Sequence, residues 1–157
     1  MENRIDYVDK HLGSLEDFVR ANSKYYLEVW RNNKIKFNFA AFLFETLWFA
    51  YRKMYDWAII FLIINLIINL LIFLVLIKTK FYMGGVFLVF LIRIFVGFEA
   101  SDIYYNRAKK KLEKYEFEPE DKECGTSLFF ATVIFFIMII FQVILDFYSE
   151  INLYYGV

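Results

Sequence analysis

The sequence predicts an all-α membrane protein with three transmembrane helices, an N-terminal amphipathic helix and an interfacial or re-entrant aromatic helix. Three observations predict this fold class. Sixty per cent of the 157 residues are hydrophobic and 22% are aromatic, which is too apolar for an ordinary soluble domain. The 18 basic and 18 acidic residues crowd into a few segments. Between those segments lie three apolar stretches of about 20 residues, the length that a membrane span requires.

Residues 1–36 are charged and are predicted to form a polar arm with one amphipathic helix. Ser14 is placed to cap the start of this helix, and Asp17 lies favourably in its first turn. Apolar side chains then recur at roughly helical spacing. They are Leu15, Phe18, Val19, Tyr26, Val29 and Trp30. We expect this apolar face to lie against the membrane surface or the rest of the protein.

Residues 37–55 are rich in aromatic side chains and are interrupted by Glu45. The uninterrupted apolar part is shorter than a membrane span. We therefore predict an interfacial or re-entrant helix, with Trp48, Tyr51 and Tyr55 at the depth of the lipid headgroups. The alternative is a short fourth span, which would carry the charged arm across the membrane.

The three predicted spans are residues 57–77, 81–98 and 128–148. The first has no charged residue, and a short turn at 78–80 separates it from the second. The second is apolar except for Arg93, and the third contains Gln142 and has Asp146 near its end. Residues 149–157 form the predicted external tail.

Residues 99–127 join the second and third spans, and their first part is predicted to continue as an amphipathic helix. Its apolar positions are Ile103, Tyr104, Ala108, Leu112 and Tyr115. Pro119 and the surrounding acidic residues end the helix. The acidic residues lack the glycine turn and ligand order of a calcium loop, so we expect a solvated surface and no bound metal. The lone Cys124 excludes an internal disulfide.

The distribution of Lys and Arg predicts the orientation in the membrane. Nine of these residues precede residue 57 and six lie in 99–127, whereas the 78–80 turn has two and the tail has none. Because cytoplasmic segments are enriched in Lys and Arg, the N-terminus and the 99–127 loop are predicted to be cytoplasmic.

The candidate polar positions inside the predicted spans are Asn65, Asn69, Arg93 and Gln142. Arg93 lies five residues from Phe98, so we expect it to reach the headgroups or to form a structural ion pair. Asn65 and Asn69 share one helix face, and Gln142 lies at nearly the depth of Asn69. We expect these amides to hold the first and third spans together, with a pore lining as the alternative.

An aromatic run followed by a basic turn resembles the bacterial family called domain of unknown function 2628, whose members are small membrane proteins. The residues that carry this resemblance are Phe37, Asn38, Phe39, Ala40, Ala41, Phe42, Leu43, Phe44, Trp48, Tyr51, Arg52, Lys53, Met54 and Tyr55. A weaker likeness runs from Gly97 to Lys111. The chain departs from the family at Glu45-Thr46, where a Gly-Pro break is usual, and at Ser101-Asp102, where a small residue and Asn are expected. The resemblance implies a bacterial inner membrane location and supplies no catalytic residues.

The sequence contains no HExxH, Walker-type glycine loop or GxSxG motif, and it has one histidine, His11. We therefore expect no enzyme activity and no cofactor. The balanced charges leave no basic face for nucleic acid. The leading hypothesis is a non-enzymatic, multi-pass protein that binds or regulates a partner, as an accessory or immunity-type factor. Its expected partners are the lipid bilayer and either another protein or a second copy of the chain. The alternative is a small oligomeric channel or transporter, with Asn65, Asn69, Arg93 and Gln142 facing the pore.

Overall fold

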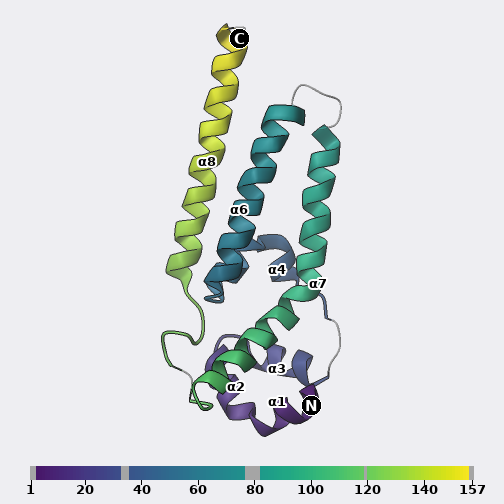
Figure 1. The fold of residues 1–157 in the computed structure, drawn as a ribbon, viewed down its shortest axis with the longest axis vertical. Helices are drawn as coiled ribbons and strands as arrows, with labels where there is room; N and C mark the ends of the chain where they lie inside the picture. Colours follow the sequence, from purple (N-terminus) through teal and green to yellow (C-terminus); the bar gives the residue numbers. More distant parts are fainter. Residues whose placement is uncertain (1–2, 33–35, 77–81, 119, 156–157) are drawn as a thin grey trace.

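The computed structural model of the chain describes residues 3–32, 36–76, 82–118 and 120–155. These residues form helices and loops, and no strand occurs among them, so the predicted all-α class is confirmed. Figure 1 shows long helices in the upper part of the molecule and a bundle of short helices below them. We call this lower bundle the head.

The head contains α1 (Arg4–Lys10), α2 (Leu12–Val19) and α3 (Ser23–Arg31), in place of the single predicted helix. Ser14 lies inside α2, so the prediction that it caps a helix start is wrong. Arg20 and Asn22 have φ angles of 54° and 61°, and this left-handed backbone separates α2 from α3.

The predicted apolar face of the arm is nevertheless buried in the protein. All six of its residues are buried: Leu15, Phe18, Val19, Tyr26, Val29 and Trp30. They pack against the second half of α7 (Tyr82–Lys114), which crosses the head. Burial of six large apolar side chains at about 1.5–3 kcal/mol each is the main force that holds the head to α7.

The aromatic segment forms two six-residue helices, α4 (Phe39–Phe44) and α5 (Thr46–Tyr51). Glu45 separates them, with a φ of 34° that ends the first helix. Each helix is only about 9 Å long, so neither can cross a bilayer by itself. Contacts place α4 against α7, and α5 against both α6 (Tyr55–Leu71) and α8 (Leu128–Tyr155).

Two helices in the described residues are long and apolar enough to cross a membrane, over Tyr55–Leu74 and Leu128–Tyr148. The first consists of α6 and the start of a short π-helix, η1 (Ile72–Leu76). They coincide with the first and third predicted spans. The predicted turn at 78–80 lies outside the described residues.

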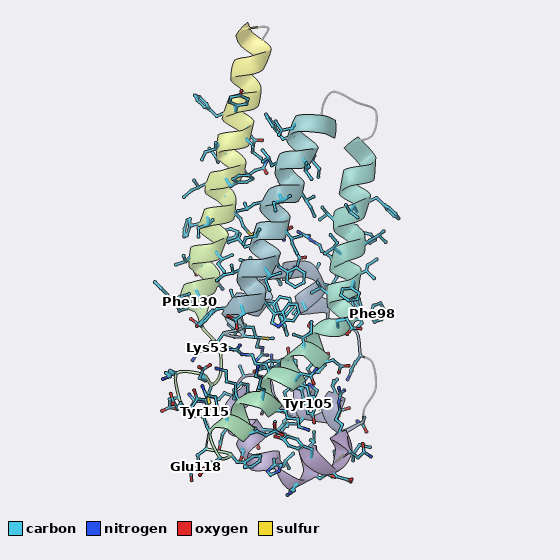
Figure 2. All side chains as sticks on the ribbon, in the orientation of Figure 1. Lys53, Phe98, Tyr105, Tyr115, Glu118 and Phe130 are labelled. Atoms are coloured by element: carbon cyan, nitrogen blue, oxygen red, sulfur yellow. The ribbon has the colours of Figure 1, made fainter. Side chains whose placement is uncertain are left out.

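The predicted second span and the amphipathic segment after it form one continuous helix, α7. Its first part contacts η1, and its second part slopes across the head (Figure 1). Figure 2 shows the change of direction near Phe98. One helix therefore connects the apolar upper part of the molecule to the head.

The last helix, α8, packs on the rest of the chain through its first half. Ile134 is buried, and Ala131 and Met138 are partly buried against the core. Beyond them the helix extends past the α6–α7 pair (Figure 1). The residues predicted as a tail continue this helix as far as Tyr155.

Candidate functional site

Asn38, immediately before α4, joins three helices. Its Oδ1 accepts a hydrogen bond from the main-chain N–H of Ala41 at 3.0 Å and so caps α4. Its Nδ2 lies 3.5 Å from the hydroxyl oxygens of Tyr26 in α3 and Ser101 in α7. Its main-chain N–H donates to the carbonyl of Gly97 at 2.7 Å. The one buried side chain thus fixes the positions of α3, α4 and α7 relative to each other.

Gly97 allows the chain before α4 to approach α7 closely. A Cβ atom at this position would lie 2.5 Å from Cε2 and 2.6 Å from Cζ of Phe37, and 3.1 Å from Cβ of Phe42. The Phe37 ring is itself held between Phe42 and Phe98, with ring centroids 5.4 and 5.0 Å away. The bond from Asn38 also brings an outside donor to a carbonyl of α7, which is a recognised cause of helix bending.

Arg52, immediately after α5, is a buried cation that lies against aromatic rings. Its Nη1 donates to the carbonyl of Ala21 at 2.9 Å. Its Cζ lies 4.5 Å from the ring centroid of Tyr26 and 5.3 Å from that of Tyr104. Cation–π contacts of this kind gain strength when the cation is removed from water. Burial raises the pKa of the Tyr104 phenol to about 12, so this ring stays neutral.

Trp48 and Tyr51 complete the surroundings of Arg52. Trp48 is buried and meets Tyr104 edge-on, with 6.0 Å between ring centroids. The main-chain carbonyl of Tyr51 accepts a bond from the N–H of Ser127 at 2.7 Å. This bond ties α5 to the residue before α8.

Lys53 makes the turn between α5 and α6, with a φ of 57°. Its Nζ donates to the carbonyls of Asp121 and Lys122, at 3.4 and 3.1 Å. Its own carbonyl accepts a bond from Nη2 of Arg107 at 2.7 Å. Figure 2 shows Lys53 at the level where the long helices meet the head.

Glu123 connects the loop before α8 to the second half of α7. Its Oε1 accepts a bond from Nζ of Lys111 at 2.8 Å, and its Oε2 lies 3.4 Å from Nη2 of Arg107. The bond from Lys111, together with the positive charges of both residues, lowers the pKa of the Glu123 carboxyl. Four acidic residues of this loop are exposed, as the predicted solvated surface requires: Glu116, Glu118, Glu120 and Asp121. Glu123 differs from them, because it is bonded to basic residues of α7.

A second buried polar cluster lies beside the break between α4 and α5. Nδ2 of Asn65 lies 2.9 Å from Oε2 of Glu45, 3.2 Å from the hydroxyl of Thr46 and 2.9 Å from the carbonyl of Phe61. Glu45, Thr46 and Asn65 are all buried. The sequence predicts that Asn65 bonds to the third span, whereas its partners here are on the broken helix.

Arg93, in α7, acts on the same cluster. Its positive charge acts on the carboxyl group of Glu45, and its Nε is buried without a hydrogen-bond acceptor among the described residues. Arg93 forms no ion pair with a described residue, and the carboxylate of Asp56 lies 3.9 Å from Nη1 of Arg107. Arg93 thus acts on this cluster through its charge, without a hydrogen bond or ion pair to it among the described residues.

Asn69 and Gln142 line one cavity of about 360 Å³ between α6 and α8, together with Asn65. Asn69 donates to the carbonyl of Asn65 at 2.8 Å, and Gln142 donates to Oδ1 of Asp146 at 2.9 Å. Each amide bonds within its own helix, which corrects the expectation of a direct bond between the spans.

The candidate residues predicted from the sequence fall into two groups in space. The motif residues Asn38, Trp48 and Arg52 meet around Tyr26 and Tyr104. Asn65, Asn69 and Gln142 lie apart from them, along the cavity between α6 and α8.

The roles of Gly97, Ser101 and Tyr104 were not predicted. A signal for the first two was present, because Gly97 and Ser101 are spaced i,i+4, and pairs of small residues at this spacing mark close helix contacts.

Within the described part of the chain, no group of three His, Cys, Asp or Glu side chains could hold a metal ion. Cys124 is buried, and its Sγ lies 3.2 Å from the carbonyl of Glu120. The buried polar groups of the two clusters bond mainly to one another and to the main chain. Chemically, this arrangement fixes helix positions.

No curated protein and no solved structure matches the chain. The family model described as "Protein of unknown function (DUF2628)" matches residues 4–110. This range contains the head, the broken helix, α6 and α7 as far as the lysine run, and so includes Asn38, Arg52, Asn65 and Gly97. Since the match covers more than half of the chain, the protein belongs to the DUF2628 family of proteins of unknown function.

Proposed function

We propose that the chain is a three-span protein of the bacterial cytoplasmic membrane that works by binding a protein partner within the membrane, without catalysing a reaction. In this proposal α6, the first part of α7 and α8 cross the bilayer. The head and the loop before α8 are cytoplasmic, and the end of α8 is outside. The count of Lys and Arg on each side of the predicted spans supports this orientation.

In the same proposal, α4 and α5 form a re-entrant segment that enters from the cytoplasmic side and returns to it. Phe39 and Phe44 are 70% and 57% exposed, which suits contact with lipid. Non-helical backbone at membrane depth is tolerated only where protein covers it. The break at Glu45 meets this condition, since Asn65 of α6 bonds to the Glu45 carboxylate.

The observation that carries the proposed partner binding is the cavity of about 360 Å³ between α6 and α8, which we call the groove. Its floor includes the amides of Asn65, Asn69 and Gln142, and its wall on α8 is exposed at Phe135 and Ile139. The Gln142–Asp146 pair on α8 is also exposed. Exposed amide and carboxyl groups on a spanning helix are costly in lipid and favour association with another helix. We therefore propose that a transmembrane helix of the partner fills this groove.

Site-specific photo-cross-linking in intact cells tests this proposal. Ile139 lines the groove, while Ile140 lies about 100° further around α8 and is similarly exposed, at 59% against 41%. A photoreactive residue at 139 should give one discrete cross-linked species, and the same residue at 140 should give only diffuse lipid adducts. Equal products from both positions would contradict the proposal. The mass of the cross-linked species shows whether the partner is a second copy of the chain or a different protein.

The amide-lined groove also supports the alternative of an oligomeric channel. In that case Asn69 and Gln142 would face water, and replacing either with Leu would abolish solute or ion flux in liposomes. In the partner-binding proposal, the same liposomes show no flux above that of protein-free vesicles. A flux that depends on Asn69 and Gln142 would replace partner binding with the channel function.

A further inference from the structure

A cavity of about 580 Å³ lies between the start of α6 and the second half of α7. Four basic residues of α7 line it: Arg107, Lys110, Lys111 and Lys114. Their spacing of three and four residues places them on one face of the helix. Asp56 is the acidic residue in the lining, so cations outnumber carboxylates there. This surplus of positive charge suits an anionic ligand.

Two of these cations are bonded to groups of the protein, and the other two have no ion-pair partner among the described residues. Arg107 donates to the carbonyl of Lys53, and Lys111 bonds to Glu123. Lys110 and Lys114 are exposed and form no ion pair with any described residue. Nζ of Lys114 lies 5.1 Å from the ring centroid of Tyr115, a contact that leaves its N–H donors without an acceptor. The cavity therefore offers two lysine ammonium groups that lack an acceptor, and the oxygen atoms of a phosphate would supply one.

The rim of this cavity on α6 is apolar. Trp57 lines the cavity and is 38% exposed, and Ile60, one helical turn further along α6, is 47% exposed. The cationic lining thus continues directly into an apolar helix surface. A soluble anion would make no use of that surface, whereas an amphipathic anion would contact both parts.

We propose that this cavity binds the phosphate headgroup of an anionic phospholipid in the cytoplasmic leaflet. Lys110 and Lys114 contact the phosphate, Arg107 and Lys111 add positive charge beside it, and Trp57 contacts the lipid near its glycerol. This proposal rests on the proposed topology, which places the start of α6 at the cytoplasmic surface. Basic pockets beside membrane spans on this side are suited to anionic headgroups, and each Lys or Arg near the surface strengthens their binding.

Quenching of tryptophan fluorescence by brominated lipids tests the site in the full chain. The protein is reconstituted in phosphatidylcholine vesicles that contain an equal mole fraction of either brominated phosphatidylglycerol or brominated phosphatidylcholine. Trp30 and Trp48 are buried, so a Trp57→Phe variant gives the background signal. We expect brominated phosphatidylglycerol to quench Trp57 more strongly than brominated phosphatidylcholine. The Lys110→Gln/Lys114→Gln variant should lower this preference by roughly tenfold or more in relative affinity.

The Lys10→Gln/Lys24→Gln variant is the matched control, since it removes the same charge from exposed positions on the head. It should keep the preference within about twofold of the unchanged chain. Equal quenching by both lipids, or an equal loss in both double variants, would overturn the proposed site. Loss of the preference when inorganic phosphate replaces chloride at constant ionic strength would show a site for soluble phosphate, which also overturns it.

These outcomes are distinguishable from failure of the proposed function. Quenching is independent of the direction of insertion, because both leaflets contain the brominated lipid. A chain that does not enter the membrane would show no quenching by either lipid. If the chain binds no partner in the membrane, the cross-link at position 139 will be absent, but the preference for brominated phosphatidylglycerol will remain.

Discussion

The main-chain N–H of Asn38 donates a hydrogen bond to the main-chain carbonyl of Gly97, 2.7 Å away, and so attaches the start of α4 to the middle of α7. A Cβ atom at position 97 would overlap the ring of Phe37, the residue before Asn38, so a glycine leaves room for this ring beside the bond. The geometry of the broken helix therefore depends on a glycine 59 positions further along the chain than Asn38.

Replacing Gly97 with Ala should lower the free energy of unfolding by about 1–3 kcal/mol, because the new Cβ overlaps the Phe37 ring. The measurement is thermal unfolding in mild detergent, followed by circular dichroism. Gly13 is the matched control, since nothing lies within 4 Å of its added Cβ. Gly13→Ala should leave stability unchanged or raise it by up to about 1 kcal/mol. If Gly97→Ala changes the free energy of unfolding no more than Gly13→Ala does, the Phe37 ring moves aside without cost and the prediction is wrong.

Asn65→Leu should destabilise the chain by about 1.5–3 kcal/mol, because it removes a hydrogen bond to the buried Glu45 carboxylate. Asn69→Leu is the control on the same helix face, and it loses only a bond to a main-chain carbonyl. We expect it to cost about 0.6 kcal/mol. Denaturation in detergent micelles measures both. Equal costs would mean that Glu45 finds another donor when Asn65 is removed.

Arg52→Lys should cost about 1–2 kcal/mol even though the charge is kept, because the planar guanidinium that lies over Tyr26 is lost. Arg31→Lys serves as the comparison. The Arg31 side chain is 58% exposed and pairs with Asp9 at the surface, so its replacement should change stability by less than about 0.5 kcal/mol. If unfolding midpoints of the two variants agree, the aromatic surroundings contribute nothing specific to arginine.

The Glu123 contact should make stability depend on pH in the acidic range. The pKa of Glu123 is lowered from its ordinary value of 4.5 by Lys111 and Arg107, so the folded state favours the charged form. The stabilisation is therefore complete above the ordinary pKa and is lost as the pH falls through the lower folded-state pKa. The unfolding midpoint of the unchanged chain should fall more steeply below about pH 5 than that of Glu123→Gln. Parallel pH profiles would count against the Lys111 contact in solution.

Cysteine labelling tests the topology in a Cys124→Ala background. Gly13→Cys, in the head, should react with a membrane-impermeant reagent only after the cells are permeabilised. Gly156→Cys should react in intact cells, because the charge distribution places the C-terminus outside. Labelling of position 13 but not of position 156 in intact cells would reverse the proposed orientation.

Features that depend on composition along the chain were predictable. The positions of α6 and α8 follow from the length of their uncharged stretches, and the buried face of the head follows from helical spacing. The continuation of α7 beyond its apolar part was also predicted, because the amphipathic pattern follows the apolar one near Phe98 without an intervening proline.

Features that depend on tertiary contacts were not predictable. Arg20, Asn22, Glu45 and Lys53 all adopt positive φ angles, which non-glycine side chains disfavour and residue type does not reveal. The partner of Asn65 is 20 positions away on a separate helix, so spacing along α6 could not identify it. The aromatic surroundings of Arg52 come from α3 and α7, and these elements meet only in the folded chain.

Because α7 is one continuous helix, a change in its tilt would move the part from Gly97 to Lys114 as a single arm. From Gly97 to Lys114 the helix is about 25 Å long, so a 10° tilt of this arm would carry Lys114 through about 4 Å. The head would travel with it, because Trp30 donates to the carbonyl of Ser101 and Arg4 pairs with Asp102. In the proposed topology, a change in the tilt of α7 within the bilayer would thus displace the head by about the width of a side chain.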